Sequence, residues 1–541
     1  MKAAKKERLP AEAPSTPSEY TTGWRLPALV LALGMAIFLV AVDTTIVSTA
    51  IPAISTEFQS VSSNGWYGSA FFLTNAAAQS SWGKIYRYLL LKATFVSSMA
   101  LFEVGSLICA LAQNPATLIV GRALAGAGAA GVVSGAYTIL AVSAAPKIRS
   151  ALTAIFGVSY AVASFVGPLL GGAFTSATTW RWCFWINLPV GGVTLVIVLL
   201  IFNPPSSCVP EPASWQSILK QLDLLGVVLF ITAMTCYLLA LEWGGGVKTW
   251  GDADVIGTLT AAGIIALLFC LQQWFMHDSA MIPRGLLLTR SMTTHCAVIF
   301  FLAPAFFILL YYLPIYFQVV RGLSATASGV RTVPLVLACG FLSALSGIYM
   351  SALGYGLPPM LLGSASTAIA CGVLYRLSAN SSSAFWIGLQ VLSGTGVGIA
   401  CQVPMIVNQA TAAASDLSSA TGLTLFFQMT GGALFLQLAQ CLLNNKLGSY
   451  LGAHLDASGQ HVDPRIVLGA GAAGIAEMFG ADELGVVLGA YMAGLRVTFV
   501  LGAVLAGVAT VISGLTGMRS IKGQGQGQSA GDGELETSRG S

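Results

Sequence analysis

The chain has 541 residues and a net charge of +4, and 55% of its residues are hydrophobic while only 9% are charged. Soluble domains carry roughly 25% charged residues. The composition, with a mean hydropathy of +0.79, therefore excludes a soluble globular protein and predicts a polytopic membrane protein. Its 60 glycines fit this class, because small residues let transmembrane helices approach closely. The ten cysteines contain no CxxC pair and lie mostly in apolar runs, where Cys behaves as a small hydrophobe.

The two ends of the chain are polar. Residues 1–26 are basic and rich in proline, which is typical of a disordered tail. A signal peptide would have a shorter apolar stretch nearer the start and a small-residue cleavage site, so the first apolar run is expected to stay in the protein. Residues 517–541 are predicted to form a second disordered tail.

Fourteen apolar runs lie between the tails, and each is close to the roughly 20 residues that cross a bilayer as a helix. An even number places both termini on one side. Segments on that side hold 16 Lys and Arg and the opposite segments hold 7, a bias that predicts cytoplasmic termini. The runs are 27–49, 66–83, 93–112, 116–143, 151–175, 183–203, 223–243, 255–275, 293–319, 327–350, 357–377, 384–408, 418–443 and 489–516.

A carboxylate, Asp43, lies inside the first run. On insertion scales a charge at the centre of a membrane helix costs roughly 2.5–3.5 kcal/mol. Such residues usually face the interior of the helix bundle or a watery cavity, and they commonly handle protons or ions. Asp43 is therefore the leading candidate for a functional residue.

Two further charged residues lie inside runs, Glu103 in the third and Arg122 in the fourth. Asp43 and Arg122 both lie toward the outer ends of their runs, so we expect them to meet at similar depth. A protonatable acid beside a permanent cation makes a switch, because protonation of the acid releases the Arg. Glu103 is a further candidate for proton coupling. The alternatives are a purely structural ion pair and, for Glu103, a protonated acid that hydrogen-bonds a neighbouring helix.

The fifth run combines glycines with a proline. Gly157, Gly167, Gly171 and Gly172 predict close packing against a neighbouring helix. Pro168 removes one backbone hydrogen bond and predicts a kink. We expect this surface to seal one end of a cavity.

Several segments together resemble the major facilitator superfamily and, within it, the 14-spanner drug:proton antiporters of the fungal toxin and multidrug efflux type. The resemblance covers nearly the whole chain. The segments are AVDTTIVSTAIPAI (Ala41–Ile54), LIVGRALAGAGAAG (Leu118–Gly131), GVSYAVASFVGPLLGG (Gly157–Gly172), WRWCFWINLPVGG (Trp180–Gly192), YYLPIYFQVVRGLSATASGV (Tyr311–Val330) and QVPMIVNQATAAASDLSSATGLTLFFQMTGGA (Gln402–Ala433).

This resemblance implies an all-α fold of two six-helix bundles plus an extra two-helix hairpin. The bundles would comprise residues 27–203 and 293–516, with a linker and the hairpin at 204–292 and a long outer loop at 444–488. It also implies that Asp43 and Arg122 take part in proton transfer. The motif around Gly167 and Pro168 is the one that marks exporters in this family.

One motif departs from the family pattern. The loop after the second run reads GKIYRYLLLK (Gly83–Lys92) and keeps Gly83 and Lys92. Arg87 stands where the family has an Asp, so the family's Asp-based charge latch lacks its acidic residue here. The fuller basic loop of sugar porters is also missing, which disfavours that subfamily.

The sequence thus predicts a proton-coupled exporter of small, largely apolar organic molecules such as toxins, secondary metabolites or drugs. We expect a monomer in the lipid bilayer that uses no cofactor or metal and binds no nucleic acid. The plasma membrane is the expected location, with the vacuolar membrane as the alternative. Polar and aromatic side chains within the runs are candidates to line the substrate site: Asn75, Gln79, Tyr160, Tyr311, Gln402 and Gln428.

Three alternatives remain open on the sequence. An importer of the same fold, for siderophores or amino acids, is disfavoured by the motif around Gly167 and Pro168. A membrane-embedded enzyme would need clustered His, Asp or Glu, but the four histidines lie near or outside the ends of runs and form no metal-ligand pair at helical spacing. A non-transporting sensor would show no energised flux. The sequon at Asn380 lies in a predicted outer loop.

Overall fold

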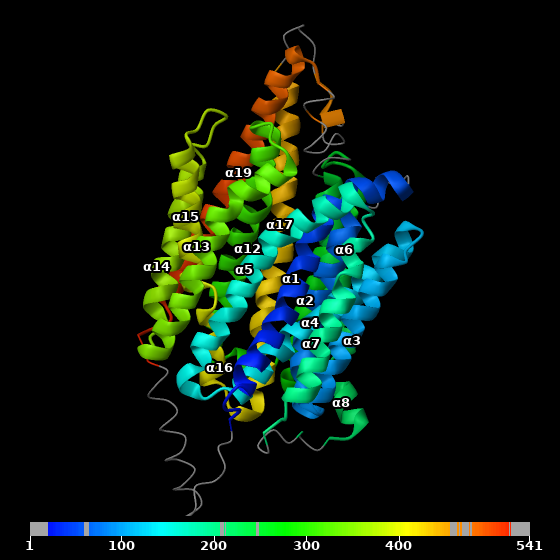
Figure 1. The fold of residues 1–541 in the computed structure, drawn as a ribbon. Helices are drawn as coiled ribbons and strands as arrows, with labels where there is room; N and C mark the ends of the chain where they lie inside the picture. Colours follow the sequence, from blue (N-terminus) through cyan, green and yellow to red (C-terminus); the bar gives the residue numbers. More distant parts are fainter. Residues whose placement is uncertain are drawn as a thin grey trace, which may run out of the picture.

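The computed structural model describes residues 20–58, 64–205, 210, 213–244, 248–454, 462–464, 466–467, 475, 479–518 and 520. Most of the two predicted tails, residues 1–19 and 521–541, and part of the predicted outer loop at 444–488 lie outside the described residues. The described chain is a bundle of α-helices (Figure 1). One isolated β-bridge joins Tyr355 to Ser520.

The first half of the bundle covers the first six predicted runs, with a break in the sixth run between α6 and α7. Local signals explain where α4 begins, because Asn114 accepts a hydrogen bond from the Thr117 amide and Pro115 follows as the first helical residue. The helices are α1 (Arg25–Phe58), α2 (Asn64–Tyr88), α3 (Leu91–Ala110), α4 (Pro115–Ser143), α5 (Pro146–Ala177), α6 (Trp182–Trp185) and α7 (Asn187–Ile201).

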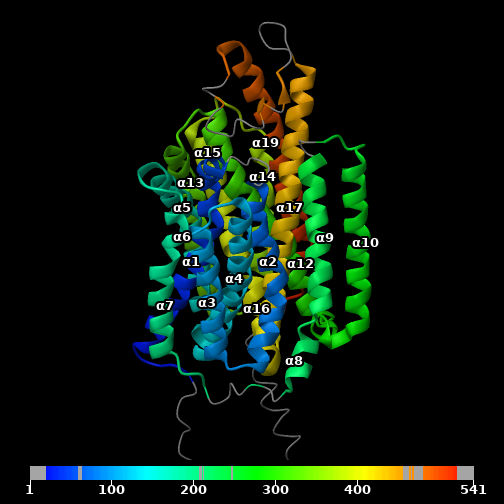
Figure 2. The same ribbon diagram turned by 90° about the vertical axis from the view of Figure 1, so that its right-hand side faces the viewer.

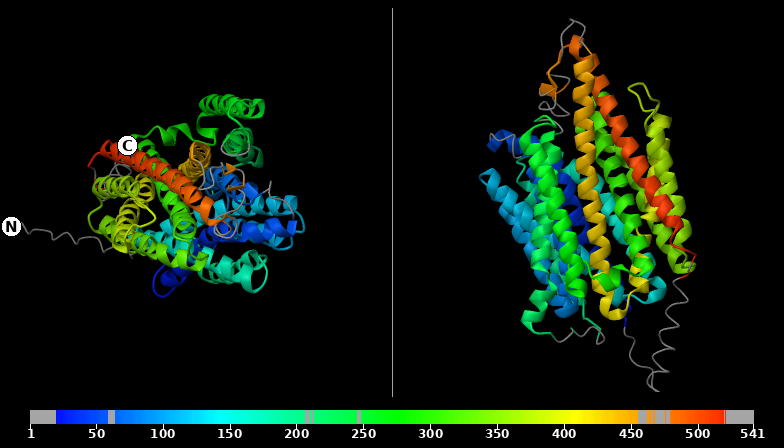
Figure 3. Two further views of the ribbon diagram at one scale, coloured as in Figure 1. Left: turned by 90° about the horizontal axis from the view of Figure 1, so that it is seen from above. Right: turned by 180° about the vertical axis from the view of Figure 1, so that it is seen from behind.

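The middle of the chain forms the predicted hairpin. Its long helices α9 and α10 pack against each other on the outside of the bundle, where α9 contacts α2 and α17 (Figures 2 and 3). Apolar side chains such as Ile264, Leu267 and Phe275 on α10 are exposed, as suits a lipid-facing helix. The elements are α8 (Trp215–Gln221), α9 (Leu224–Glu242), α10 (Ala253–Met276), η2 (His277–Ser279) and α11 (Arg284–Leu287).

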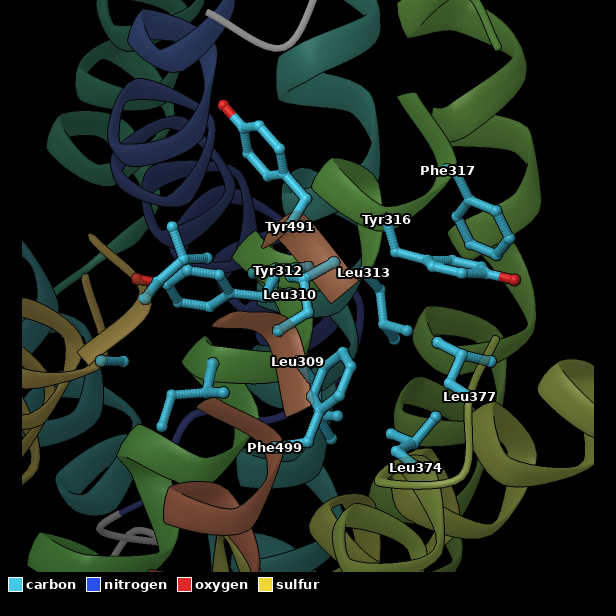
Figure 4. Packing of buried hydrophobic residues seen from close by; sticks show 14 of the residues in the cluster. Leu309, Leu310, Tyr312, Leu313, Tyr316, Phe317, Leu374, Leu377, Tyr491 and Phe499 are labelled. Atoms are coloured by element: carbon cyan, nitrogen blue, oxygen red, sulfur yellow. The ribbon is translucent and has the colours of Figure 1, made fainter. Parts of the chain in front are cut away.

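The second half covers the last six predicted runs. Its core is built from side chains of helices far apart in sequence, including Leu309, Tyr312, Leu374 and Phe499 (Figure 4). The elements are α12 (Arg290–Ile315), the π-helical turn η3 (Tyr316–Val320), α13 (Ala325–Ala352), α14 (Leu357–Leu374), α15 (Ser383–Ala400), α16 (Val403–Thr411), η4 (Ala414–Asp416), α17 (Leu417–Ala453) and α19 (Ala481–Gly514).

The structure therefore places a helix at each of the fourteen predicted runs. By length and composition, 13 stretches of the described residues can cross a membrane. The remaining helix, α2, is 25 residues long but is less apolar, because it carries Asn75, Gln79, Lys84 and Arg87. Its neighbours α4 and α17 cover it, so Asn75, Gln79 and Lys84 are buried within the bundle, while Arg87 at its end is partly exposed.

Both ends of the bundle's chain lie on one side. The start of α1 at Arg25 and the end of α19 at Gly514 are at the same face (Figure 1), which we call the terminal face. We call the opposite face, where α1 ends and α2 begins, the far face.

The two halves pack closely at the terminal face, where α2 crosses α17. A Cβ added to Gly83 would meet the Ser418 carbonyl oxygen at 2.8 Å and the Cα of Gly422 at 3.2 Å. Real Cβ atoms essentially never come within 3.0 Å, so only glycine fits at this crossing. The structure thus gives Gly83 a packing reason, while its role in conformational change stays a prediction.

The helices α5 and α13 show the same trend. From the terminal face toward the far face, the nearest α5 atom to a Cβ added at Gly347, Gly340 and Gly329 lies 2.5, 3.8 and 4.0 Å away. The Ala151 amide also donates to Ser351 Oγ at 3.1 Å near the terminal face. The halves are therefore tightly closed at the terminal face and looser toward the far face.

Within the first half, α5 packs closely on α1. A Cβ at Gly167 would overlap Thr45, and one at Gly171 would overlap Thr49 Oγ1 and lie 2.7 Å from the Ile46 carbonyl. The expected glycine surface is therefore present at these two positions. It does not include Gly172, where an added Cβ would meet nothing within 4 Å, because this residue points away from α1.

These neighbouring glycines offer a matched test of the packing. Gly171→Leu forces bulk into the α1 backbone, and overpacking of this kind costs about 1–3 kcal/mol. Gly172→Leu adds the same bulk to open space. We expect a lower Tm in detergent for Gly171→Leu and a Tm close to wild type for Gly172→Leu. Equal Tm values for the two variants would contradict the close approach of α5 to α1.

Candidate functional site

A buried ion pair lies between α1 and α4. Arg122 Nη1 donates to Asp43 Oδ2 at 2.5 Å, and both residues are 0% exposed. Arg122 Nε also donates to the Tyr67 carbonyl of α2 at 2.8 Å. The structure thus brings together the two charged residues that the sequence placed at similar depth.

Aromatic rings complete the surroundings of the Arg122 guanidinium. Its Cζ lies 4.4 Å from the ring centroid of Phe71 and 5.9 Å from that of Phe184, and such ring faces attract a cation. Its third nitrogen, Nη2, has no hydrogen-bond partner among the residues that the structure describes. The guanidinium is therefore held mainly by Asp43, Tyr67 and the Phe71 ring.

The second oxygen of Asp43 binds an amide that sequence reasoning missed. Asn187 Nδ2 donates to Asp43 Oδ1 and to Ser106 Oγ, each at 3.0 Å. Asn187 is the first residue of α7 and is 0% exposed. The sequence feature that could have identified Asn187 is a polar amide near the start of an otherwise apolar run. The sequence alone does not show which way this side chain points.

Glu103, the other acid within a run, lies apart from the ion pair. It is one helical turn from Ser106 on α3, and a Cβ at Gly191 of α7 would overlap its Oε1. Neither carboxyl oxygen has a hydrogen-bond partner among the described residues. The structure therefore places Glu103 against α7, near Asn187 and Ser106. No hydrogen bond or ion pair joins it to Asp43 or Arg122 among the described residues.

A cavity of about 80 Å³ lies between the two halves. Five of the six predicted lining residues border it: Asn75, Gln79, Tyr160, Gln402 and Gln428. The sixth, Tyr311, is not among the lining residues. Its hydroxyl donates instead to the Thr44 carbonyl at 3.4 Å, and Thr44 borders the cavity. Ligand pockets usually have about 300–1,000 Å³, so the halves must separate to admit a drug-sized molecule.

The cavity walls are apolar and aromatic with a few amides. None of the described residues that border it carries a formal charge. Gln79 Nε2 donates to Asn75 Oδ1 at 3.1 Å, and Tyr137 of α4 donates across the interface to Gln402 Oε1 at 3.1 Å. Tyr137 was not predicted, although a phenol within an apolar run resembles the aromatic candidates that were.

Two motif residues have clear positions near this site. Gly157 borders the cavity, and a Cβ there would lie 2.8 Å from Gln402 Nε2. Lys92 lies far from the cavity, at the terminal face, where its Nζ donates to the Leu199 carbonyl at 2.7 Å. Lys92 therefore ties α3 to α7 within the first half, and no hydrogen bond or ion pair joins it to the described residues of the second half.

A second ion pair joins the halves at the terminal face. Arg87 Nη1 at the end of α2 lies 2.6 Å from Asp416 Oδ1, just before α17, and both side chains are about one-third exposed, at 28% and 35%. The polarity is the reverse of what the family motif implies, because the basic residue is on the first half. The sequence analysis found that the family's charge latch lacks its Asp in this loop. The Arg87–Asp416 pair provides a charge contact between the halves at the same place.

Lys84 fastens the same region to the hairpin. Its Nζ donates to the carbonyls of Gln221 at 2.8 Å and Ser279 at 3.1 Å, and also to that of Ala280. Both Lys84 and Arg87 border a terminal-face cavity of about 900 Å³. Opening of the terminal face would therefore strain contacts to the hairpin as well as those between the halves.

The Arg87–Asp416 pair can be tested by charge reversal. Arg87→Asp places two carboxylates together and should favour opening of the terminal face, whereas Arg87→Asp with Asp416→Arg should restore closure. The pair is partly exposed and worth about 0.2–1 kcal/mol, so we expect a population change of a few-fold. Spin-label distances between exposed positions 90 and 353, on opposite halves, would report it. No recovery in the double variant would contradict the pairing.

Comparison with known proteins agrees with this architecture. The model of the Major Facilitator Superfamily matches residues 33–436. The MFS-type transporter thnB of Trichoderma harzianum is 42% identical over 92% of this chain and 85% of its own length. The aspyridones efflux protein of Neocamarosporium betae is 41% identical over 84% and 80%, and the dehydrocurvularin exporter of Aspergillus terreus is 38% identical over 92% and 86%.

Solved structures show the same fold at low sequence identity. A double-Trp variant of XylE aligns with a TM-score of 0.60 and 12% identity over 92% of this chain and 96% of its own. A bacterial homologue of the lysosomal transporter Spinster, in an inward-facing and unoccupied conformation, aligns with a TM-score of 0.53 and 16% identity over 92% and 98%. The described helices thus follow the arrangement of these transporters.

Proposed function

This chain belongs to the major facilitator superfamily, and we propose that it is a proton-coupled exporter of small, largely apolar organic molecules such as secondary metabolites, toxins or drugs. The observation that carries the proposal is the fully buried Asp43–Arg122 pair next to an uncharged cavity between the two halves. An antiporter needs a titratable group whose protonation is coupled to substrate binding, and a buried intramembrane acid is the expected candidate.

The cavity and the relatives support the substrate class. Aromatic and aliphatic walls with a few amides suit a molecule that is mostly apolar and has some hydrogen-bonding groups. No charged side chain among the described lining residues is available to hold a strongly charged substrate. Relatives that cover most of this chain carry the names of an aspyridones efflux protein and a dehydrocurvularin exporter.

Protonation of Asp43 is the proposed switch. The charged carboxylate holds Arg122 Nη1, and a proton on Asp43 removes the attraction between them. The Phe71 ring carries the change onward, because it faces the guanidinium and also borders the cavity. Each proton that moves inward gains about 2.3 kcal/mol per 100 mV of membrane potential, which is energy for export. Glu103 is proposed as a second proton-binding group, one helical turn from Ser106 on α3.

The terminal face is proposed to be cytoplasmic, because the Lys and Arg residues are concentrated on that side. The described conformation is closed there, at Gly83 and Gly422 and at the Arg87–Asp416 pair. Loading from the cytoplasm then requires these contacts to open, while the far face closes. We propose a monomer in the plasma membrane, with the vacuolar membrane as the alternative, and bundle boundaries at residues 203 and 293.

The packing of α5 on α1 supports an exporting cycle. Gly167 and Gly171 contact α1 within the two turns that follow Asp43, at Thr45, Ile46 and Thr49. Movement of α1 after protonation is thus transmitted directly to α5, which borders both the cavity and α13. We propose that this contact keeps protons from leaking when no substrate is bound.

The proposal predicts that Asp43→Asn abolishes proton-driven export. Asn cannot take up a proton, and it keeps the size of Asp43. In proteoliposomes, flux driven by a pH jump should fall at least tenfold while substrate binding in detergent is retained. Inside-out vesicles give the direction of transport. Wild-type flux from Asp43→Asn would contradict the coupling role. Net movement of substrate from the far face to the terminal face would contradict export.

A second prediction concerns the shape of the cation. Arg keeps its charge and donates in a fixed fork to Asp43 and the Tyr67 carbonyl, whereas Lys keeps the charge as a single point. Arg122→Lys should retain part of the transport, and Arg122→Ala should retain almost none, because it leaves Asp43 as an unpaired buried acid. Flux measured at matched folded protein would reveal the difference. Equal flux from both variants would show that charge at this position has no role.

A further inference from the structure

We propose that Asn187 accepts a hydrogen bond from Asp43 once Asp43 is protonated. The side-chain amide of Asn187 rotates so that Oδ1 replaces Nδ2 beside the carboxyl group. This inference rests on the proposed function, because it concerns how the same proton site changes partners. It assigns Asn187 a positioning role that neither the charges nor the family resemblance identifies.

The bonds of Asn187 are complete on one side of the amide only. Nδ2 has two hydrogens, and they go to Asp43 Oδ1 and Ser106 Oγ, each at 3.0 Å. Oδ1 is buried and has no hydrogen-bond partner among the residues that the structure describes. An amide with a satisfied donor end and an empty acceptor end favours a charged Asp43 in this conformation.

Protonation reverses what Asp43 requires. A carboxylate only accepts hydrogen bonds, whereas a carboxylic acid also donates one. Arg122 has no acceptor to offer, because a guanidinium carries donors alone. The protonated group therefore needs a nearby acceptor. Rotation of the Asn187 amide about its Cβ–Cγ bond brings its unused oxygen to the position that Nδ2 now occupies.

The rotated amide matches the same two neighbours. Oδ1 has two lone pairs, so it can accept from the new Asp43 hydroxyl and from the Ser106 hydroxyl, which can act as donor or acceptor. The proton that arrives stays on Asp43 Oδ1, and no covalent bond of Asn187 changes. One atom of the amide lacks a partner in either orientation, so these two neighbours favour neither orientation by the number of bonds. The protonation state of Asp43 therefore decides which orientation is adopted.

Other groups near Asp43 do not offer this exchange. Glu103 and Cys109 on α3 and Cys183 on α6 lie within electrostatic range of Asp43, but no hydrogen bond joins them to it among the described residues. The Tyr67 carbonyl on α2 already accepts a hydrogen bond from Arg122. Among the described residues, Arg122 and Asn187 hydrogen-bond the Asp43 carboxylate, and of these two only Asn187 has a group that can also accept.

The test compares Asn187→Leu with wild type by the pH dependence of substrate-induced proton release in detergent. Leu has nearly the size of Asn but makes no hydrogen bond. The charged form of Asp43 loses the stronger bond, because bonds to ions exceed those between neutral groups. The midpoint of proton release should therefore move up by about one pH unit, and pH-driven flux should fall several-fold. Asn187→Ala serves if Asn187→Leu does not fold, with the same expected shift.

Ser106→Ala is the matched control. It removes the neighbour but leaves the Asp43–Asn187 bond, so its midpoint should shift by less than that of Asn187→Leu. Unchanged midpoint and flux in the Asn187 variants, with normal proton release from wild type, would overturn the exchange and leave the proposed function intact. Absence of any substrate-induced proton release from wild type would overturn the proposed function and this inference together.

Discussion

The structure depends on one buried interaction, the ion pair of Asp43 with Arg122. Neither charge is tolerable alone in the bundle, because removing one partner of a buried pair costs about 3–5 kcal/mol. The pair fixes how α1, α2 and α4 meet, since Arg122 also donates to the Tyr67 carbonyl. A proton on Asp43 neutralises the acid and leaves the buried Arg122 cation without its counter-charge, so protonation strongly disfavours this arrangement. The same interaction that holds the helices together is therefore also suited to release them.

The ion pair and the cavity are separate but share neighbours. Phe71 contacts Arg122 and borders the cavity, and α1 packs directly on α5 at glycines. The cavity is small in this conformation, and the halves are tightest at the terminal face. A change at the ion pair therefore acts on helices that form both the cavity wall and the interface between the halves.

The sequence predicted the helices well, because thirteen of the fourteen runs correspond to stretches with the length and apolarity that a membrane span requires. It also predicted that Asp43 and Arg122 meet, since the depth of a residue can be counted along a straight helix. The direction in which a side chain points around its helix cannot be counted this way. Gly172 was wrongly grouped with Gly171 on the surface that packs against α1. Tyr311 was wrongly predicted to line the cavity, because its hydroxyl donates to the Thr44 carbonyl of α1. Contacts between distant segments, such as Asn187 with Asp43 and Arg87 with Asp416, require the packed structure.

The central claim, that Asp43 exchanges its proton as substrate binds, is tested most directly by infrared difference spectroscopy of the protein in lipid. The C=O stretch of a protonated carboxyl group is separate from the bands of carboxylates and amides. The account predicts that adding substrate at constant pH removes a protonated-carboxyl band, and that Asp43→Asn lacks this difference while Glu103→Gln keeps it. A wild-type spectrum with no change in the carboxyl region, under conditions where substrate binds, would contradict the account.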